Sequence, residues 1–152
     1  MRRAAVAVAL AVALVGCSDQ TPAAGPAASP SDERRSGVLD GVELALEVAD
    51  TVDERAVGLM GRTSVPAGTG MVFLYDEPTN GAFYMYMVPI PLLAVFINDG
   101  RVVSSVVMPP CEQAQPGDCP TYGADGPFDT VVETDPATLP DVAPGDTFVL
   151  AD

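Results

Sequence analysis

The apolar residues between positions 42 and 150 occur in short runs separated by turn residues, and this pattern constrains the fold most. Val42, Leu44, Leu46 and Val48 alternate with other residues, as in a strand with one buried face. Further short runs at residues 71–75, 82–88, 92–98, 101–108, 128–134 and 147–150 are expected to be strands as well. Because no long helical segments alternate with them, the sequence predicts a mainly β domain, closed as an antiparallel β-sandwich or a flattened barrel.

Two local motifs predict how these elements are connected. Asp99-Gly100 lies between two apolar runs and is a favoured pair for a two-residue hairpin turn, in which both residues take positive φ. Thr51 and Glu54 have the spacing of a capping box, in which each residue accepts a backbone hydrogen bond from the other. One short helix is therefore expected near residues 52–60.

The start of the chain has the organisation of a bacterial lipoprotein signal. Two arginines are followed by an apolar run over residues 4–15, which is shorter than the about 20 residues that span a bilayer. The run ends in Leu14-Val15-Gly16-Cys17, which resembles a lipobox. We expect residues 1–16 to be a signal peptide and Cys17 to be lipidated, with an ordinary secretory leader as the alternative. The protein would then be exported and lipid-anchored on the outer face of the cytoplasmic membrane.

The segment after this cysteine has the composition of a tether. Residues 17–37 are rich in Ala, Pro, Ser and Gly and lack apolar periodicity, so they cannot bury enough apolar surface to fold. A single β-rich domain is expected over residues 38–152.

Composition excludes several kinds of chemistry. The net charge is −14, from 7 basic and 21 acidic residues, and such a surface repels phosphate backbones, so nucleic-acid binding is not expected. The chain has no histidine, and every basic residue is arginine. Histidine triads, histidine metal sites and lysine Schiff bases are therefore excluded, which leaves carboxylates, tyrosine, arginine, hydroxyls and cysteines.

Two cysteines remain after the proposed lipidation site. Cys111 and Cys119 flank a loop rich in proline, glycine and acidic residues. In an oxidising envelope they most simply form a structural disulfide, and the alternatives are a metal-thiolate pair or a redox-active pair.

A segment rich in aromatic residues and methionine is the predicted contact surface for an envelope protein or a small ligand. It consists of Phe83, Tyr84, Met85, Tyr86 and Met87. On a strand, the two methionines of this segment would point to the same face. Together with Met108 they could form a thioether site that selects Cu(I), whereas the alternative is that the methionines simply fill gaps in the core.

The few arginines allow a second kind of site. Arg55 and Arg62 are seven residues apart and could share a face, where they would clamp an anionic ligand. The alternative is that they pair with neighbouring carboxylates such as Asp53 or Glu54, and such exposed pairs contribute little stability.

Several sequence blocks resemble the family called domain of unknown function 192. They are Glu54-Arg55-Ala56-Val57-Gly58-Leu59-Met60-Gly61-Arg62, Gly70-Met71-Val72-Phe73, Phe83-Tyr84-Met85, Ile90-Pro91-Leu92, Phe96-Ile97, Asp99-Gly100-Arg101-Val102-Val103, Pro110-Cys111, Cys119-Pro120 and Tyr122. The resemblance covers about residues 42–149 and implies a mostly-β sandwich, but no activity. Family members usually carry Lys-Asn-Thr and a later Asp where this chain has Tyr86, Met87, Val88 and Leu93, so this chain replaces polar groups with apolar and thioether groups.

We therefore expect an envelope lipoprotein with a non-catalytic binding or interaction module and no resident cofactor. A Cu(I)-handling lipoprotein that uses Met85 and Met87 is the first alternative. The second is a hydrolase built on carboxylates and arginine, which would need a cleft with a carboxylate buried beside Arg55 or Arg62.

Overall fold

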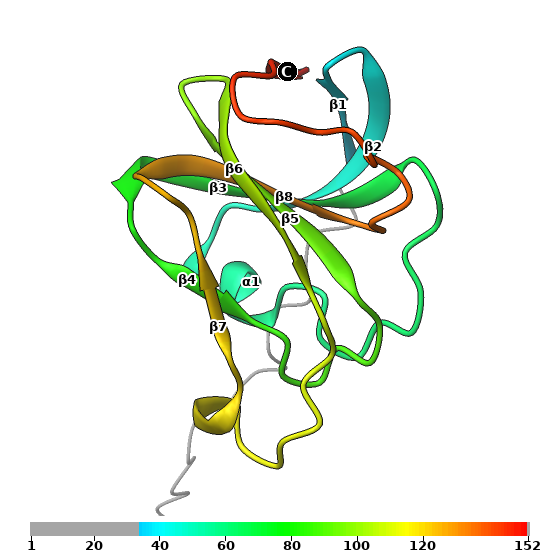
Figure 1. Cartoon of the computed structure of the whole chain (residues 1–152), viewed down its shortest axis with the longest axis vertical. Coiled ribbons are helices and arrows are strands. Elements are labelled where there is room, and N and C mark those ends of the chain that lie inside the picture. Colours follow the sequence, from blue (N-terminus) through cyan, green and yellow to red (C-terminus); the bar gives the residue numbers. More distant parts are fainter. Residues whose placement is uncertain (1–33, 152) are drawn as a thin grey trace, which may run out of the picture.

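The computed structural model describes residues 34–151, and it confirms the mainly β fold (Figure 1). A curled seven-stranded sheet forms a half-barrel, against which a two-stranded sheet and one short helix pack. The elements, in chain order, are β1 (Arg34–Leu39), β2 (Val42–Ala49), α1 (Val52–Val57), β3 (Thr69–Thr79), β4 (Ala82–Tyr84), β5 (Leu92–Asn98), β6 (Arg101–Met108), η1 (Pro116–Asp118), β7 (Thr121–Gly123), β8 (Phe128–Thr134) and β9 (Phe148–Leu150).

The strand order of the large sheet is β6-β5-β8-β3-β2-β1-β9, and β4 pairs with β7 in the small sheet. Every pair is antiparallel except β2 with β3, which run parallel. Parallel neighbours need a crossover connection, and here the chain between these strands contains α1 and the loop that follows it. The helix therefore lies against the sheet because it belongs to the crossover between the parallel strands β2 and β3.

The two edges of the large sheet meet at one end. Arg101 at the start of β6 forms a bridge with Thr147, just before β9. On either side of this bridge, the Val102 N–H donates to Asp146 O and the Phe148 N–H donates to Gly100 O, both at 2.9 Å. These bonds close the sheet locally, which explains its half-barrel shape.

The sheet buries apolar side chains on both faces, so the domain has two core clusters. The first cluster includes Leu46, Val95 and Val132, with Phe148 from the C-terminal segment. The second, called the helix-side core below, is made of Ala49, Leu59, Met71, Phe73, Met85, Val88, Leu92, Ala94, Phe96, Met108, Phe128 and Val131. Figure 1 shows α1, β4 and β7 on one side of the large sheet and the C-terminal segment on the other.

Both local motifs form as predicted. In the Asp99-Gly100 turn the two φ angles are 49° and 69°. At the start of α1 the Glu54 N–H donates to Thr51 Oγ1 at 3.2 Å, and the Thr51 N–H donates to Glu54 Oε2 at 3.1 Å. The helix is shorter than expected, because Gly58 has a φ of 47° and ends it after residue 57.

The predicted strand over residues 82–88 is wrong in its second half. Strand β4 ends at Tyr84, and Met87 has a φ of 58°, which an extended strand does not allow. The Gly61 N–H donates to Met87 O at 2.8 Å, so this turn is held by the loop after α1. A long-range backbone contact therefore overrides the apolar pattern.

The predicted boundary of the tether is also wrong, because residues 34–37 belong to β1. A Cβ atom on Gly37 would lie 2.8 Å from Leu46 Cδ1 and 2.9 Å from Phe148 Cε2. Gly37 makes this segment resemble a tether by composition. In the structure, however, its lack of a side chain leaves room for the side chains of Leu46 and Phe148 to pack over it. Strand β7 was also not predicted, since its three residues carry no alternating pattern.

Candidate functional site

A cavity of about 110 Å³ lies between α1, β4 and the helix-side face of the large sheet. The loop after α1 contributes the remaining wall. Aromatic, aliphatic and thioether groups make up most of the lining, and four side chains add polar or charged atoms. The lining residues are Arg55, Ala56, Val57, Gly58, Leu59, Met60, Phe73, Tyr75, Ala82, Phe83, Tyr84, Met85, Val88, Leu92 and Glu133.

Glu133 is the most unusual residue of this cavity. It lies on β8, paired with Met71 on one side and Ala94 on the other, so it is part of the helix-side core. The residue is only 5% exposed, and no other part of residues 34–151 forms a hydrogen bond or an ion pair with its carboxyl group. Burial raises the pKa of Glu133 from 4.5 to about 8. The group is therefore mostly a neutral carboxylic acid at pH 7.

Tyr75 and Arg55 form the polar part of the cavity wall. The Arg55 guanidinium carbon lies 4.8 Å from the centroid of the Tyr75 ring, a cation–π contact. Its Nη1 donates to Leu74 O at 2.7 Å and also to Asp50 O, so two backbone carbonyls fix the guanidinium. Burial raises the pKa of the Tyr75 hydroxyl, and the nearby charges of Arg55 and Glu133 act on it in opposite directions. Tyr75 therefore stays a neutral phenol near the buried acid.

Phe83 connects the small sheet to the core. Its ring packs edge-on against Phe73 at 5.2 Å and Phe96 at 5.8 Å between centroids. Its backbone pairs with Tyr122 of β7. Tyr122 also packs against the helix-side core, so both strands of the small sheet contribute an aromatic side chain to this packing.

The predicted contact surface is divided by the turn after β4. Phe83, Tyr84 and Met85 line the cavity, whereas Tyr86 and Met87 do not. Met85 is 1% exposed and packs in the helix-side core, while Met87 is 58% exposed. The prediction that the two methionines share a face is wrong, because the strand ends before them.

Met108, the remaining member of the predicted thioether site, lies in the same buried cluster as Met85. Met108 is fully buried in the helix-side core, as expected for methionine that fills space. Among residues 34–151, no three Cys, Asp or Glu side chains are grouped so that they could hold a metal ion. The Cu(I) alternative through methionine therefore stays a prediction.

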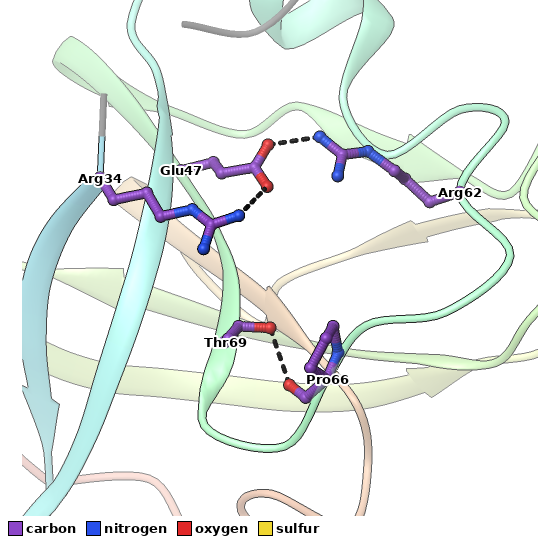
Figure 2. Close-up of polar contacts among 5 residues, drawn as sticks. All are labelled: Arg34, Glu47, Arg62, Pro66 and Thr69. Atoms are coloured by element: carbon purple, nitrogen blue, oxygen red, sulfur yellow. Dashed lines mark hydrogen bonds and ion pairs between the residues drawn. The ribbon is translucent and has the colours of Figure 1, made fainter. Parts of the chain in front are cut away.

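Arg62 lies apart from Arg55, and the two do not form a shared clamp. Figure 2 shows Arg62 and Arg34 on either side of the Glu47 carboxylate, with nitrogen–oxygen distances of 2.5 Å and 3.4 Å. Arg62 thus pairs with a carboxylate as predicted, although its partner is Glu47 rather than Asp53 or Glu54. For Arg55 the predicted pairing is wrong, since Glu54 caps the helix and Arg55 binds backbone carbonyls. This three-residue cluster borders a second cavity of about 220 Å³ and connects β1, β2 and the loop before β3.

That loop is also fixed beside the cluster. Thr69 Oγ1 donates to Pro66 O at 2.7 Å (Figure 2). Both arginines of the cluster share one carboxylate, so each guanidinium is at least partly neutralised there. We see the cluster as a structural link between β1 and the loop rather than as a ligand site.

The predicted disulfide forms between Cys111 and Cys119, whose Cα atoms are 5.7 Å apart. The backbone of Cys111 forms a parallel β-bridge with Tyr86. The disulfide closes a loop that contains η1 and leads directly into β7. Because β7 pairs with β4, the disulfide restrains the strand that carries Phe83. Its contribution to the cavity is therefore to position one wall.

Two polar residues of the cavity wall, Glu133 and Tyr75, were not predicted from the sequence. One signal for Glu133 was present, because this acidic residue directly follows Val131-Val132 in a predicted strand. A carboxyl group in such a strand must be buried, paired or functional. Nothing in the sequence indicated that Glu133 and Tyr75 would line the same cavity, because their positions depend on the pairing of β8 with β3.

The predicted signal peptide, the lipidation site Cys17 and most of the tether lie outside the described residues. Within residues 34–151, no helix is long and apolar enough to cross a membrane.

Comparisons with known proteins place the fold but give no activity. A search of curated proteins finds no match. A solved protein of unknown function from Novosphingobium aromaticivorans is 30% identical, with a TM-score of 0.63 over 81% of this chain and 94% of that one. A candidate transcription regulator from Sinorhizobium meliloti is 24% identical, with a TM-score of 0.67 over 81% of this chain and 96% of that one. Residues 35–149 match the family DUF192, described as Uncharacterized ACR, and the chain therefore belongs to this family.

Proposed function

We propose that this protein is an exported, lipid-anchored envelope lipoprotein whose domain binds a small, mostly apolar ligand in the cavity beneath β4. The observation that carries this proposal is the unpaired carboxyl group of Glu133 in an apolar cavity. Burying such a group without a partner costs stability, so a leucine would serve a purely structural core better. Departures from structural rules of this kind are expected at functional sites.

The size and lining of the cavity support a small ligand. An engineered apolar cavity of about 150 Å³ takes up benzene, so a cavity of 110 Å³ has the size for a molecule or substituent of about one ring. Phe73, Phe83 and Met85 supply apolar walls, and the few polar groups would fix orientation. The net charge of −14 makes an anionic polymer an unfavourable partner.

The binding proposal is tested with toluene as probe, because it measures the apolar cavity alone. The mature chain, residues 18–152, is exported without lipidation so that the disulfide forms, and amide NMR shifts are followed during titration. We expect shifts at residues that line the cavity. Val88→Phe, which fills the cavity wall, should abolish them, whereas the control Val107→Phe on the exposed side of β6 should not. Shifts that persist in Val88→Phe would refute binding in this cavity.

The lipid anchor needs its own test. Metabolic labelling with a radioactive fatty acid should label the wild-type protein and not a Cys17→Ser variant. The labelled protein should sediment with membranes, while the variant should keep its leader sequence. Equal labelling of both would refute lipidation at Cys17.

A carboxylate-based enzyme is the second candidate, and one observation favours it. Glu133 lies buried in a cavity that Arg55 also lines, which is the arrangement that this alternative requires. A pKa of about 8 is close to the operating pH of a general acid or base. A panel of fluorogenic esters and glycosides tests this function. Turnover that disappears in Glu133→Gln but survives in Glu77→Gln would support an enzyme, and the absence of turnover on all of them would favour binding alone.

A further inference from the structure

The polar groups of the cavity are all hydrogen-bond donors when the domain is at neutral pH. A guanidinium can only donate, whereas a phenol and a protonated carboxyl group each donate one hydrogen bond and can also accept one. Arg55, Tyr75, Tyr84 and Glu133 are the only charged or titratable residues among those that line the cavity. An acceptor atom on the ligand is therefore the one kind of partner that can pair with any of these groups.

The charge of the ligand follows from the surroundings of Glu133. Arg55 does not pair with this carboxyl group, because its Nη1 binds the carbonyls of Leu74 and Asp50 and its guanidinium lies over Tyr75. A cationic ligand would meet a guanidinium on the wall and would also have to ionise a buried acid. An anionic ligand would lose its hydration in a mostly apolar cavity beside that same acid. A neutral ligand has neither cost.

We propose that the ligand is a neutral carbonyl compound, such as an amide, ester or ketone with a small apolar substituent, whose oxygen accepts a hydrogen bond from the Glu133 carboxyl group. The substituent lies against Phe73, Phe83 and Met85 on the apolar wall. This inference rests on the proposed function, because it names the ligand class of the same cavity. It adds a specific role for Glu133 as the donor that orients the ligand.

Four ring compounds of similar size separate the possibilities. Benzamide carries a neutral carbonyl, toluene no acceptor, benzylamine a cation and benzoate an anion. Affinities of the mature chain are measured by NMR titration near pH 6, where Glu133 is protonated, and near pH 9.5, where it is ionised. We expect benzamide to bind about tenfold more tightly than toluene at the lower pH, since one hydrogen bond in a buried site has that effect. The advantage should disappear at the higher pH.

Two variants at residue 133 test the donor directly. Glu133→Gln keeps an N–H donor but cannot ionise, so its preference for benzamide should persist at both pH values. Glu133→Leu removes the donor, and its benzamide affinity should fall to that of toluene. Glu77→Gln serves as the control, because Glu77 is exposed on β3, the strand that carries Tyr75.

Each other outcome has a distinct meaning. Equal binding of toluene and benzamide would refute the carbonyl ligand and leave the binding cavity in place. Binding of none of the four compounds would refute the proposed function itself. Tightest binding of benzylamine, strengthening as pH rises, would show that an ionised Glu133 recognises amines and would overturn the inference. Tightest binding of benzoate would overturn it in favour of Arg55.

Discussion

Replacement of Glu133 by glutamine is expected to stabilise the domain at pH 8 and to remove most of its pH dependence above pH 5. The pKa of Glu133 is about 8 in the folded state, against an ordinary value of 4.5. The folded protein therefore holds a proton that the unfolded chain releases between these two values. The contribution of this group to the unfolding free energy is fully present below pH 4.5 and is lost as pH rises toward 8. The reason is that the unfolded chain ionises the group over this range, whereas ionisation in the folded state is unfavourable.

The magnitude follows from the size of the shift. Each unit of pKa difference corresponds to about 1.4 kcal/mol, so the whole shift corresponds to about 5 kcal/mol. Between pH 5 and pH 8 the wild-type protein should lose about 3 kcal/mol of unfolding free energy, which is a large share of the stability of a small domain. Glutamine has a similar shape and does not ionise, so the variant should lose little over this range.

Urea unfolding followed by far-UV circular dichroism at a series of pH values measures this effect, since the chain has no tryptophan to report it. Glu77→Gln is again the matched control and should follow the wild-type curve. The hydrogen bonds from Thr51 lower the pKa of Glu54, so that group titrates on the acid side of this range. Parallel curves for wild type and Glu133→Gln would refute the buried, unpaired state of this carboxyl group.

Three further variants test other features of the structure. The double change Cys111→Ser and Cys119→Ser should lower the unfolding free energy by about 2–3 kcal/mol, because the chain between these residues is no longer closed into a loop. Calorimetry should then show a melting temperature lower by about 10 °C. Gly70→Ala should destabilise the domain by several kcal/mol or prevent folding, because the new Cβ would lie 2.3 Å from the backbone oxygen of Glu133. A soluble variant with wild-type urea unfolding would contradict this packing. Thr51→Ala should cost about 1 kcal/mol in the same assay through loss of the helix cap, and an unchanged midpoint would argue against it.

The parts of the fold that depend on neighbouring residues were predictable. The Asp99-Gly100 hairpin and the Thr51–Glu54 capping box formed because each is specified within a few residues. The central strands were recognisable from their apolar runs, since they are buried on both faces.

The parts that depend on distant contacts were not predictable. Residues 34–37 form strand because β2 pairs with all four of them and β9 pairs with Gly37. Met87 leaves the strand conformation at a position where its backbone oxygen accepts a hydrogen bond from Gly61. The candidate site combines residues of α1, β3, β4 and β8, so only the register of the sheet brings them together. Phe83, Tyr84 and Met85 were predicted from the composition of their segment, whereas the acidic residue of the site was not.

The strand order has a consequence for how the protein is made. β8 lies inside the large sheet between β5 and β3, and β9 pairs with β1, yet these are the last two strands of the chain. The core therefore cannot close until late in synthesis, because this interior strand emerges near the end. Folding dominated by such distant pairings is slow. A chain with this order stays open until translation is nearly complete, which is compatible with the proposed export through a secretion channel.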